Sequence, residues 1–108
     1  MRFDRYLIIL RYGIGMMASN NELSRDVIVK NELGLHARSA AQITSLVQNA
    51  KARIWVQKGE DRADASSVLE ILTLACERGT TITIKIEHPS DLEILNAIAD
   101  LVDHGFGE

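Results

Sequence analysis

From residue 25 onward, hydrophobic and polar positions follow patterns typical of short strands and amphipathic helices. Strands are predicted where apolar residues recur at every second position, and helices where they recur at every third or fourth. The expected strands are Arg25 to Asn31, Ala52 to Gln57, Glu60 to Ala63 and Thr80 to Glu87. The expected helices run from about Ala37 to Asn49, from Ser67 to near Arg78, and from Leu92 to just before Gly105.

Residues that begin and end helices stand at the boundaries of these segments. Ser67-Val68-Leu69-Glu70 and Ser90-Asp91-Leu92-Glu93 both match the capping box, in which a serine caps the first turn and a glutamate reaches back to it. Gly79 follows the second helix, where a glycine commonly ends one. Lys58-Gly59 indicates a hairpin turn, and the strand after it is short and polar enough to lie at a sheet edge.

The predicted order of elements is β-α-β-β-α-β-α. Each strand has one apolar face, and three helices need a surface on which to bury theirs. An antiparallel four-stranded sheet with the three helices on one face and water on the other satisfies both needs. The expected fold is therefore α+β, an open-faced β-sandwich, in one domain over residues 25–108.

Residues 1–24 do not continue these patterns and are interpreted as an N-terminal extension. Their apolar run, Tyr6 to Leu10, is flanked by arginines and is far too short to span a bilayer. A cleaved secretory signal fits the pattern loosely, but nothing downstream is typical of an extracellular protein. We favour a disordered or loosely docked extension, or translation that begins at Met16 or Met17.

The net charge and the cysteine content limit the partners and the location that can be expected for the chain. The formal net charge is -3 and no basic run is present, so no nucleic-acid partner is expected. The single Cys76 excludes an intramolecular disulfide, fits a cytoplasmic location and is interpreted as a small packing residue. Trp55 is interpreted as strand packing, and His88 and His104 as surface residues. We expect a monomer with no metal, no cofactor and no membrane insertion.

The segment from Asn31 to Ala41 carries the candidate chemistry. A strand ends, Gly34 turns the chain, and His36 stands where the next helix begins. The first N–H groups of a helix lack internal partners and carry the positive end of its dipole, which favours a bound anion and disfavours a protonated imidazole. We therefore expect the His36 ring to be neutral and nucleophilic near neutral pH.

A phosphoryl group on this ring would meet the free backbone N–H groups of Ala37 and Arg38. The Arg38 guanidinium is also suited to bind phosphate oxygens. The sequence shows no acidic pair, metal cluster or Gly-rich nucleotide loop, so the catalytic machinery would belong to partners and the chain would be a carrier rather than an enzyme. On its own, however, a histidine after a glycine is usually a cap or a surface residue.

The sequence Gly34-Leu35-His36-Ala37-Arg38 resembles the active-site signature of the HPr family, the histidine phosphocarriers of the bacterial phosphoenolpyruvate-dependent sugar phosphotransferase system. Asp64 to Leu69 resembles the family's regulatory-serine motif, Gly79 to Ile84 its fourth strand, and Gly105 to Glu108 its C-terminus. The likeness extends from about Arg25 to Glu108, in the family's order and spacing.

The resemblance implies that phosphorylated enzyme I phosphorylates His36 on ring Nδ1, as a pros-phosphohistidine. His36 would then donate the group to an EIIA-type domain, in sugar transport or its regulatory branch, with Arg38 orienting the phosphoryl group. The family usually has proline after this arginine, whereas this chain has Ser39. We expect serine to fix the first helical turn less than proline, which affects the rate and rigidity of the site rather than its chemistry.

The resemblance further implies that Ser67 is the serine that HPr kinase/phosphorylase modifies in some bacteria, although the capping box alone explains a serine here. A phosphate at a helix N-terminus would be tolerated and would add about two negative charges to a partner surface. Val68, Leu69 and Leu72 are expected to form that surface, an exposed apolar patch, with the first two facing the partner and Leu72 at the border.

Two other functions remain open. One is an HPr-like regulatory protein that docks on enzymes or transcription factors and is controlled at Ser67, without obligatory phosphotransfer. The presence of His36 and Arg38 argues against it, whereas Ser39 leaves it open. The other is a ferredoxin-like domain that binds a small ligand, which the βαββαβ order permits but which gives no reason for a histidine at a helix start.

Overall fold

The computed structural model describes residues 23–108, and its elements follow the predicted order. The strands are β1 (Ser24–Ile28), β2 (Ile54–Lys58), β3 (Asp61–Asp64) and β4 (Thr81–Ile86). The helices are α3 (Ala37–Leu46), α4 (Val68–Thr73) and α5 (Leu92–Asp103), with short 3-10 helices η2 (Pro89–Asp91) and η3 (Gly105–Gly107). Residues 1–22, most of the interpreted N-terminal extension, lie outside the described residues.

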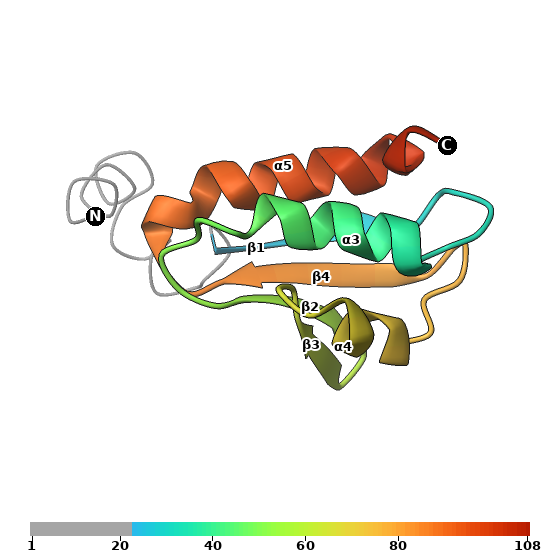
Figure 1. Cartoon of the computed structure of the whole chain (residues 1–108), viewed down its shortest axis with the longest axis horizontal. Coiled ribbons are helices and arrows are strands. Elements are labelled where there is room, and N and C mark those ends of the chain that lie inside the picture. The colour runs from blue at the N-terminus through green and yellow to red at the C-terminus, as the bar shows by residue number, and fades with distance from the viewer. Residues whose placement is uncertain (1–22) are drawn as a thin grey trace.

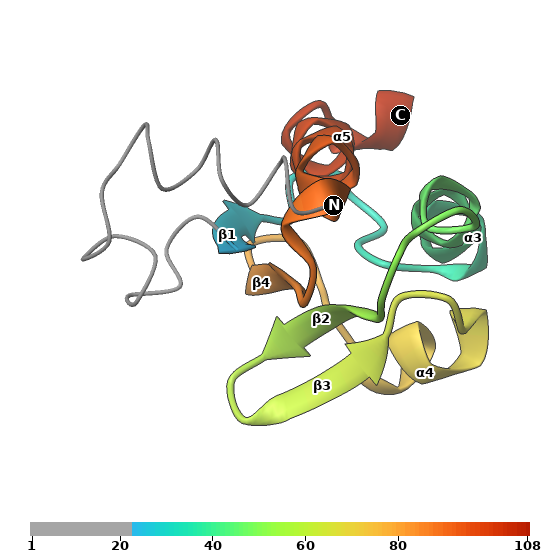
Figure 2. The same cartoon turned by 90° about the vertical axis from the view of Figure 1, so that its left-hand side faces the viewer.

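The four strands form one antiparallel sheet in the order β1-β4-β2-β3. All three α-helices cover one face of this sheet, and residues 23–108 place no helix on the other face (Figures 1 and 2). The predicted α+β open-faced sandwich is confirmed. The largest fully buried side chains of the core between sheet and helices include Ile43, Ile71, Ile82, Ile84, Leu95 and Ile98.

Trp55 lies on the open face of the sheet. Its neighbours in β2, Ile54 and Val56, are buried on the helix side, so alternation turns the indole outward. Arg62 of β3 lies 3.8 Å from the centre of the ring, and Nε1 donates a hydrogen bond of 2.8 Å to Glu87. The residue therefore packs against neighbouring strands, as predicted, but on the solvent side.

Most element boundaries lie close to those predicted. Helix α3 begins at Ala37 as expected but ends at Leu46 instead of Asn49. The hairpin turn is Gly59-Glu60 rather than Lys58-Gly59, because Lys58 still pairs with Asp61. The strand that begins at Asp61 is an edge of the sheet, as its short polar sequence indicated.

Helix α4 is shorter than predicted and ends at Thr73, not near Arg78. The chain leaves the helix at Ala75, which has a left-handed φ of 52°. The ammonium of Lys58 on β2 donates to the carbonyls of Leu74 and Ala75 at 3.0 and 3.1 Å. A cation from a distant strand thus satisfies the carbonyls at the end of the helix, a contact that no local pattern signals.

The segment after α4 is tied to the loop before α3. The Cys76 carbonyl accepts a hydrogen bond of 2.9 Å from Leu35 N, and the backbone of Val29 pairs with Thr80 and Gly79 at 2.9 and 2.7 Å. Cys76 therefore lies in a loop, although its side chain is buried and packs as predicted. Burial raises the pKa of its thiol.

The capping box predicted at Ser90–Glu93 is wrong. The chain enters α5 through η2, whose cap is His88: its Nδ1 accepts a hydrogen bond of 3.0 Å from Ser90 N. Asp91, directly before α5, makes no side-chain cap hydrogen bond. His88 is thus a half-buried capping residue and not a plain surface residue.

The buried Asp91 carboxylate joins the start of α5 to the chain before β2. It accepts hydrogen bonds from Lys51 N at 2.9 Å and from Ala52 N at 3.2 Å. β2 begins at Ile54, two residues after Ala52, where the sequence had placed the start of this strand.

We expect Asp91→Ala to lower the free energy of unfolding by about 3 kcal/mol, because two backbone N–H groups lose their acceptor. Chemical denaturation followed by circular dichroism measures this loss. Asp100→Ala, which removes an exposed carboxylate from the same helix, is the control and should stay within about 0.5 kcal/mol of the wild type. Equal losses in the two variants would contradict the role given to Asp91.

Candidate functional site

His36 is the N-cap residue of α3, the position that the sequence predicted. Its Nδ1 accepts a hydrogen bond from Arg38 N at 3.3 Å, and its Nε2 lies 2.7 Å from Oε2 of Glu108. A backbone N–H can bond only to an unprotonated nitrogen, and a carboxylate only to a protonated one. The network therefore selects the neutral tautomer with its proton on Nε2 and a lone pair on Nδ1.

The first turn of α3 supplies donors beside this ring. Within residues 23–108, the N–H of Ala37 has no hydrogen-bond partner, whereas the N–H of Arg38 is bound by Nδ1. Of the two N–H groups expected to be free, only that of Ala37 is. The Arg38 side chain is exposed, and its guanidinium has no hydrogen bond or ion pair in the described part of the chain.

The Glu108 carboxylate is shared between the ring and a buried amide. Its Oε1 accepts a hydrogen bond of 3.1 Å from Nδ2 of Asn31, and Oε2 faces His36. The hydrogen bond with His36, followed by that from Asn31, holds the pKa of this carboxyl below its ordinary value, and the charge of Arg38 acts in the same direction. The carboxylate is therefore kept in its charged form at this site.

The loop before His36 is held by side chains on both sides. Gly34 has a left-handed φ of 69°, and its carbonyl accepts from Asn31 Nδ2 at 2.7 Å and from Ser39 Oγ at 3.1 Å. Ser39 is fully buried, and its Oγ also accepts a hydrogen bond of 2.9 Å from His36 N. This bond and the one from Arg38 N to the His36 ring form the two halves of a capping box at the start of α3.

These bonds change the expectation for Ser39. Proline fixes its backbone torsion more firmly than serine does, but the torsion is only one of the constraints on this turn. Proline has no hydroxyl, so it could not bond the Gly34 carbonyl or the His36 N–H. Serine therefore secures the position of His36 through side-chain hydrogen bonds.

We expect Ser39→Ala to lower the free energy of unfolding by about 1 kcal/mol, as for loss of a helix cap, because the His36 N–H loses its acceptor. Thermal and chemical denaturation measure the effect. Ser45→Ala, on the exposed side of α3, is the matched control and should be neutral or slightly stabilising. If both variants were equally stable, the Ser39 hydroxyl would have no structural role.

Asn31 and Glu108 are the site residues to which sequence reasoning gave no role. Asn31 stood only as the end of a strand, and Glu108 only as part of a C-terminal motif. The contact between His36 and Glu108 joins residues 72 positions apart. No periodicity or spacing rule predicts it.

Ser67 is the N-cap of α4, as predicted. Its Oγ accepts a hydrogen bond of 3.1 Å from Glu70 N. The reciprocal half of the predicted box is absent, because the Glu70 carboxylate bonds Asp64 N at 2.9 Å instead. The serine is half-buried and serves as a cap whether or not it is modified.

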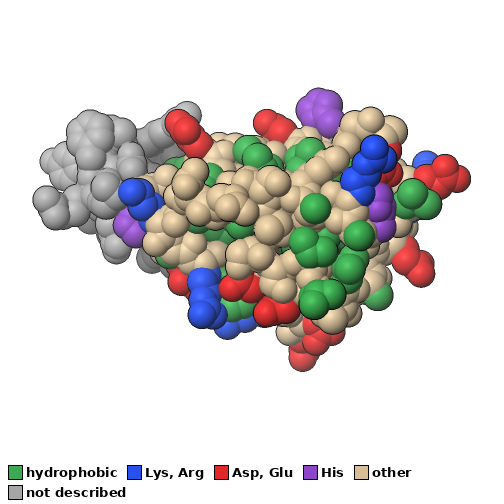
Figure 3. All heavy atoms as spheres, viewed as in Figure 1, with side chains coloured by type: hydrophobic (Ala, Val, Ile, Leu, Met, Phe, Trp, Pro, Cys, Tyr) green, Lys and Arg blue, Asp and Glu red, His purple; other side chains and the backbone are tan. Residues whose placement is uncertain are grey.

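Apolar side chains are exposed on α4 and on the loop before α3. Leu69 is 76% exposed, whereas Val68 and Leu72 are only partly exposed and pack against the core. Leu33, three residues before His36, is 70% exposed and was not predicted to belong to this surface. Figure 3 shows hydrophobic side chains gathered over α4 and the neighbouring end of α3. We call Val68, Leu69 and Leu72 the apolar patch; Leu33 is a further exposed leucine on the loop before α3.

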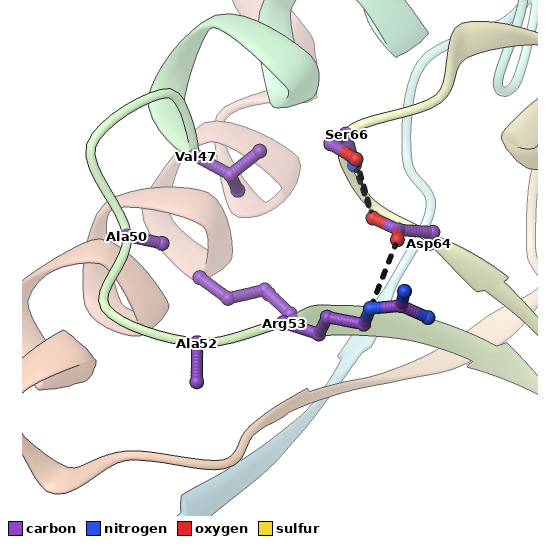
Figure 4. Close-up of a pocket in the computed structure, with 7 residues that line it drawn as sticks. Val47, Ala50, Ala52, Arg53, Asp64 and Ser66 are labelled. Atoms are coloured by element: carbon purple, nitrogen blue, oxygen red, sulfur yellow. Dashed lines mark hydrogen bonds and ion pairs between the residues drawn. The ribbon is translucent and has the colours of Figure 1, made fainter.

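A separate pocket of about 310 Å³ lies at the other end of α3 (Figure 4). Arg53 and Asp64 lie 4.0 Å apart at this pocket, and the Ser66 hydroxyl and N–H donate to Asp64 at 2.6 and 2.8 Å. The Ser66 hydroxyl contributes most to holding the pKa of Asp64 below its ordinary value. The lining residues are Val47, Ala50, Ala52, Arg53, Ile54, Asp64 and Ser66. None of them belongs to the His36 site.

The described residues were also considered for a metal site and for a membrane-spanning helix. Among residues 23–108, no three histidine, cysteine, aspartate or glutamate side chains are grouped so that they could hold a metal ion. No helix in this same part of the chain combines the length and the apolar character needed to cross a bilayer.

Fold and site together define a small α+β domain that presents a histidine at the start of a surface helix. Residues 23–104 match the family model described as the PTS HPr component phosphorylation site. The phosphocarrier protein HPr of Cupriavidus necator is 34% identical over 86 residues, which cover 80% of this chain and 97% of that protein. The phosphocarrier protein NPr of Shewanella violacea is 40% identical over 87 residues, which cover 81% and 96%.

A solved structure of an HPr protein is also similar to this chain. The crystal structure of HPr-C-His from Thermoanaerobacter tengcongensis matches with a TM-score of 0.73 at 30% identity, covering 79% of this chain and 96% of that one. The chain belongs to the HPr family, the phosphocarriers of the phosphotransferase system.

Proposed function

We propose that His36 accepts a phosphoryl group from phosphorylated enzyme I and donates it to an EIIA-type protein, in sugar transport or its regulatory branch. The observation that carries this proposal is the Nδ1 lone pair of His36 at the N-terminus of α3, held by the tautomer described above. The unpaired Ala37 N–H and the unpaired Arg38 guanidinium supply donors for phosphoryl oxygens.

The accepting step needs no base. The Nδ1 lone pair attacks phosphorus and forms the new N–P bond, while the N–P bond of the donor histidine breaks and its electron pair returns to the donor nitrogen. Arg38 N–H, which now donates to Nδ1, then turns to a phosphoryl oxygen because the lone pair is used. Ala37 N–H and the guanidinium bind the remaining oxygens, and donation to the next protein reverses these events.

The apolar patch is the surface on which the partners dock. Leu69 offers most of its exposed apolar area, and Val68 and Leu72 support it from the core. A small apolar surface beside a polar reactive group suits partners that must bind briefly and leave. Phosphorylation of Ser67 by an HPr kinase/phosphorylase would add about two negative charges next to Leu69 and weaken docking there.

Residues 25–108 act as the carrier domain, and residues 1–24 are an extension outside its chemistry. The last two residues of this extension adjoin the domain itself, because Leu23 packs against the core and β1 begins at Ser24. The carrier works as a monomer in the cytoplasm.

The test is incubation of the full chain with enzyme I and phosphoenolpyruvate labelled in its phosphate. We expect acid-labile label, at one phosphoryl group per chain, that is chased onto an EIIA-type protein when it is added. A chain that takes no label from fully phosphorylated enzyme I would disprove the carrier function and favour the regulatory one.

A further inference from the structure

The pocket at the C-terminal end of α3 has no part in the proposed phosphotransfer. Its volume is about 310 Å³, and the end of α3, the start of β2 and the end of β3 meet around it (Figure 4). Small-molecule sites have volumes of about 300 to 1,000 Å³, so the pocket has room for a molecule of roughly ten non-hydrogen atoms. His36 caps the opposite end of α3, and binding in the pocket is therefore independent of the proposed function.

One side of the pocket is apolar. Val47, at the end of α3, and Ile54, at the start of β2, are 7% and 2% exposed and belong to the core. Ala50 and Ala52 are half-buried and line the pocket with them. An aliphatic group that is buried against such side chains gains free energy in proportion to the apolar area removed from water.

The other side of the pocket carries two opposite charges that no hydrogen bond joins. Arg53 Nε lies 4.0 Å from Asp64 Oδ2, which is too long for a hydrogen bond. The Arg53 side chain is 69% exposed, and within residues 23–108 its guanidinium makes no hydrogen bond. Arg53 therefore has N–H donors free for a bound anion.

The Asp64 carboxylate is fixed through one oxygen and leaves the other available. The hydroxyl and N–H of Ser66 donate to Oδ1 at 2.6 and 2.8 Å. The bond from the hydroxyl is the main cause that holds the pKa of Asp64 below its ordinary value, so the carboxylate is charged. Within the described residues Oδ2 accepts no hydrogen bond. Figure 4 shows Asp64 and Ser66 across the pocket from Val47 and Ala50.

We propose that this pocket binds a free α-amino acid with a branched aliphatic side chain, such as leucine. At neutral pH such a molecule carries a carboxylate and an ammonium on one carbon, and the pocket offers a cation and an anion side by side. The ligand carboxylate binds the Arg53 guanidinium, and its ammonium binds Oδ2 of Asp64. The aliphatic side chain packs against Val47, Ala50 and Ile54.

Titration of the full chain, labelled with nitrogen-15, with L-leucine tests this proposal by amide NMR. We expect the amide signals of Ala52, Arg53 and Ser66 to shift with a dissociation constant of about 1 mM, while that of His36 stays in place. Isocaproate is leucine without its ammonium, and isoamylamine is leucine without its carboxylate. Each should bind at least about tenfold more weakly than leucine, because one charge of the pair is left without a partner.

Two variants of the full chain remove the charges of the pocket separately. Arg53→Gln and Asp64→Asn should each weaken leucine binding at least about tenfold. Asparagine keeps a carbonyl oxygen that can accept from Ser66, so the backbone at this position is retained. Arg62→Gln and Asp61→Asn are the matched controls, because they make the same chemical changes on exposed residues of β3 outside the pocket. Both controls should bind leucine as the wild type does.

Absence of any shift of the pocket amides at roughly 10 mM leucine would overturn the proposal. Leucine binding that is unchanged in Arg53→Gln and Asp64→Asn would overturn it as well. Isocaproate or isoamylamine bound as tightly as leucine would contradict the assignment of an amino acid, since the two charges would then not be recognised together. Labelling of His36 by enzyme I is unaffected by any of these outcomes.

Discussion

Replacement of His36 by alanine is expected to reduce labelling of the chain by enzyme I and labelled phosphoenolpyruvate to background, a loss of more than about a thousandfold. The alanine side chain has no nucleophile, and no neighbouring group can substitute for Nδ1, because the adjacent Arg38 and Ser39 do not carry a comparable lone pair. The measurement is acid-labile label retained on the protein after separation from enzyme I.

His104→Ala is the matched control for this loss. His104 is exposed, lies at the end of α5 and bonds through Nδ1 to the Asp100 carbonyl at 2.7 Å. Its replacement should leave labelling unchanged. Circular dichroism must show that His36→Ala is folded, since the variant also loses the hydrogen bond from Arg38 N to the ring. Label that persists on His36→Ala and disappears from His104→Ala would place the acceptor elsewhere.

The second large effect is expected at Gly34. Alanine there must adopt a left-handed φ of 69°, and its Cβ would lie far inside van der Waals contact with the Cys76 carbonyl oxygen. That oxygen belongs to the backbone and is fixed by its hydrogen bond from Leu35 N, so it cannot yield cheaply. We expect Gly34→Ala to lower the free energy of unfolding by about 3 kcal/mol or more.

Gly59→Ala isolates the steric part of this loss. Gly59 has a similar φ of 59°, but a Cβ there meets no atom within 4 Å. The variant should therefore lose only about 1 kcal/mol, the cost of the left-handed conformation. Chemical denaturation of both variants gives the difference. If the two losses were equal, close packing of Gly34 against Cys76 would not contribute to stability.

The fold could be predicted because its determinants are local. Ile82, Ile84 and Ile86 alternate along β4 and are buried. Leu95, Ala99 and Val102 recur at helical spacing along α5 and are buried as well. In both elements the spacing of the apolar residues predicts which face is buried. Two of the predicted features that proved wrong depend on distant partners. Helix α4 ends early where Lys58 caps it, and the Asp91 carboxylate serves another segment instead of its own helix.

The candidate site divides in the same way. Gly34 before His36 and the position of His36 at a helix start follow from neighbouring residues. The expected docking residues were predicted only through a family resemblance, and the structure shows that Leu69 is the most exposed of the three. The role of the Ser39 hydroxyl could not be predicted, because the Gly34 carbonyl that it bonds comes within reach only when the loop closes.

By itself, the sequence determined the order of strands and helices, the single apolar face of each, and the place of a histidine at the tip of the first helix. Periods of two and of about 3.6 residues, together with glycine and serine at helix ends, encode these features within a few positions. Only the tertiary structure decided which nitrogen of His36 carries the proton. Glu108 lies 72 residues from His36 and reaches the ring through a turn in which Gly105, Phe106 and Gly107 have left-handed φ values. Such a contact forms only when the chain closes, so no periodic pattern in the sequence predicts it.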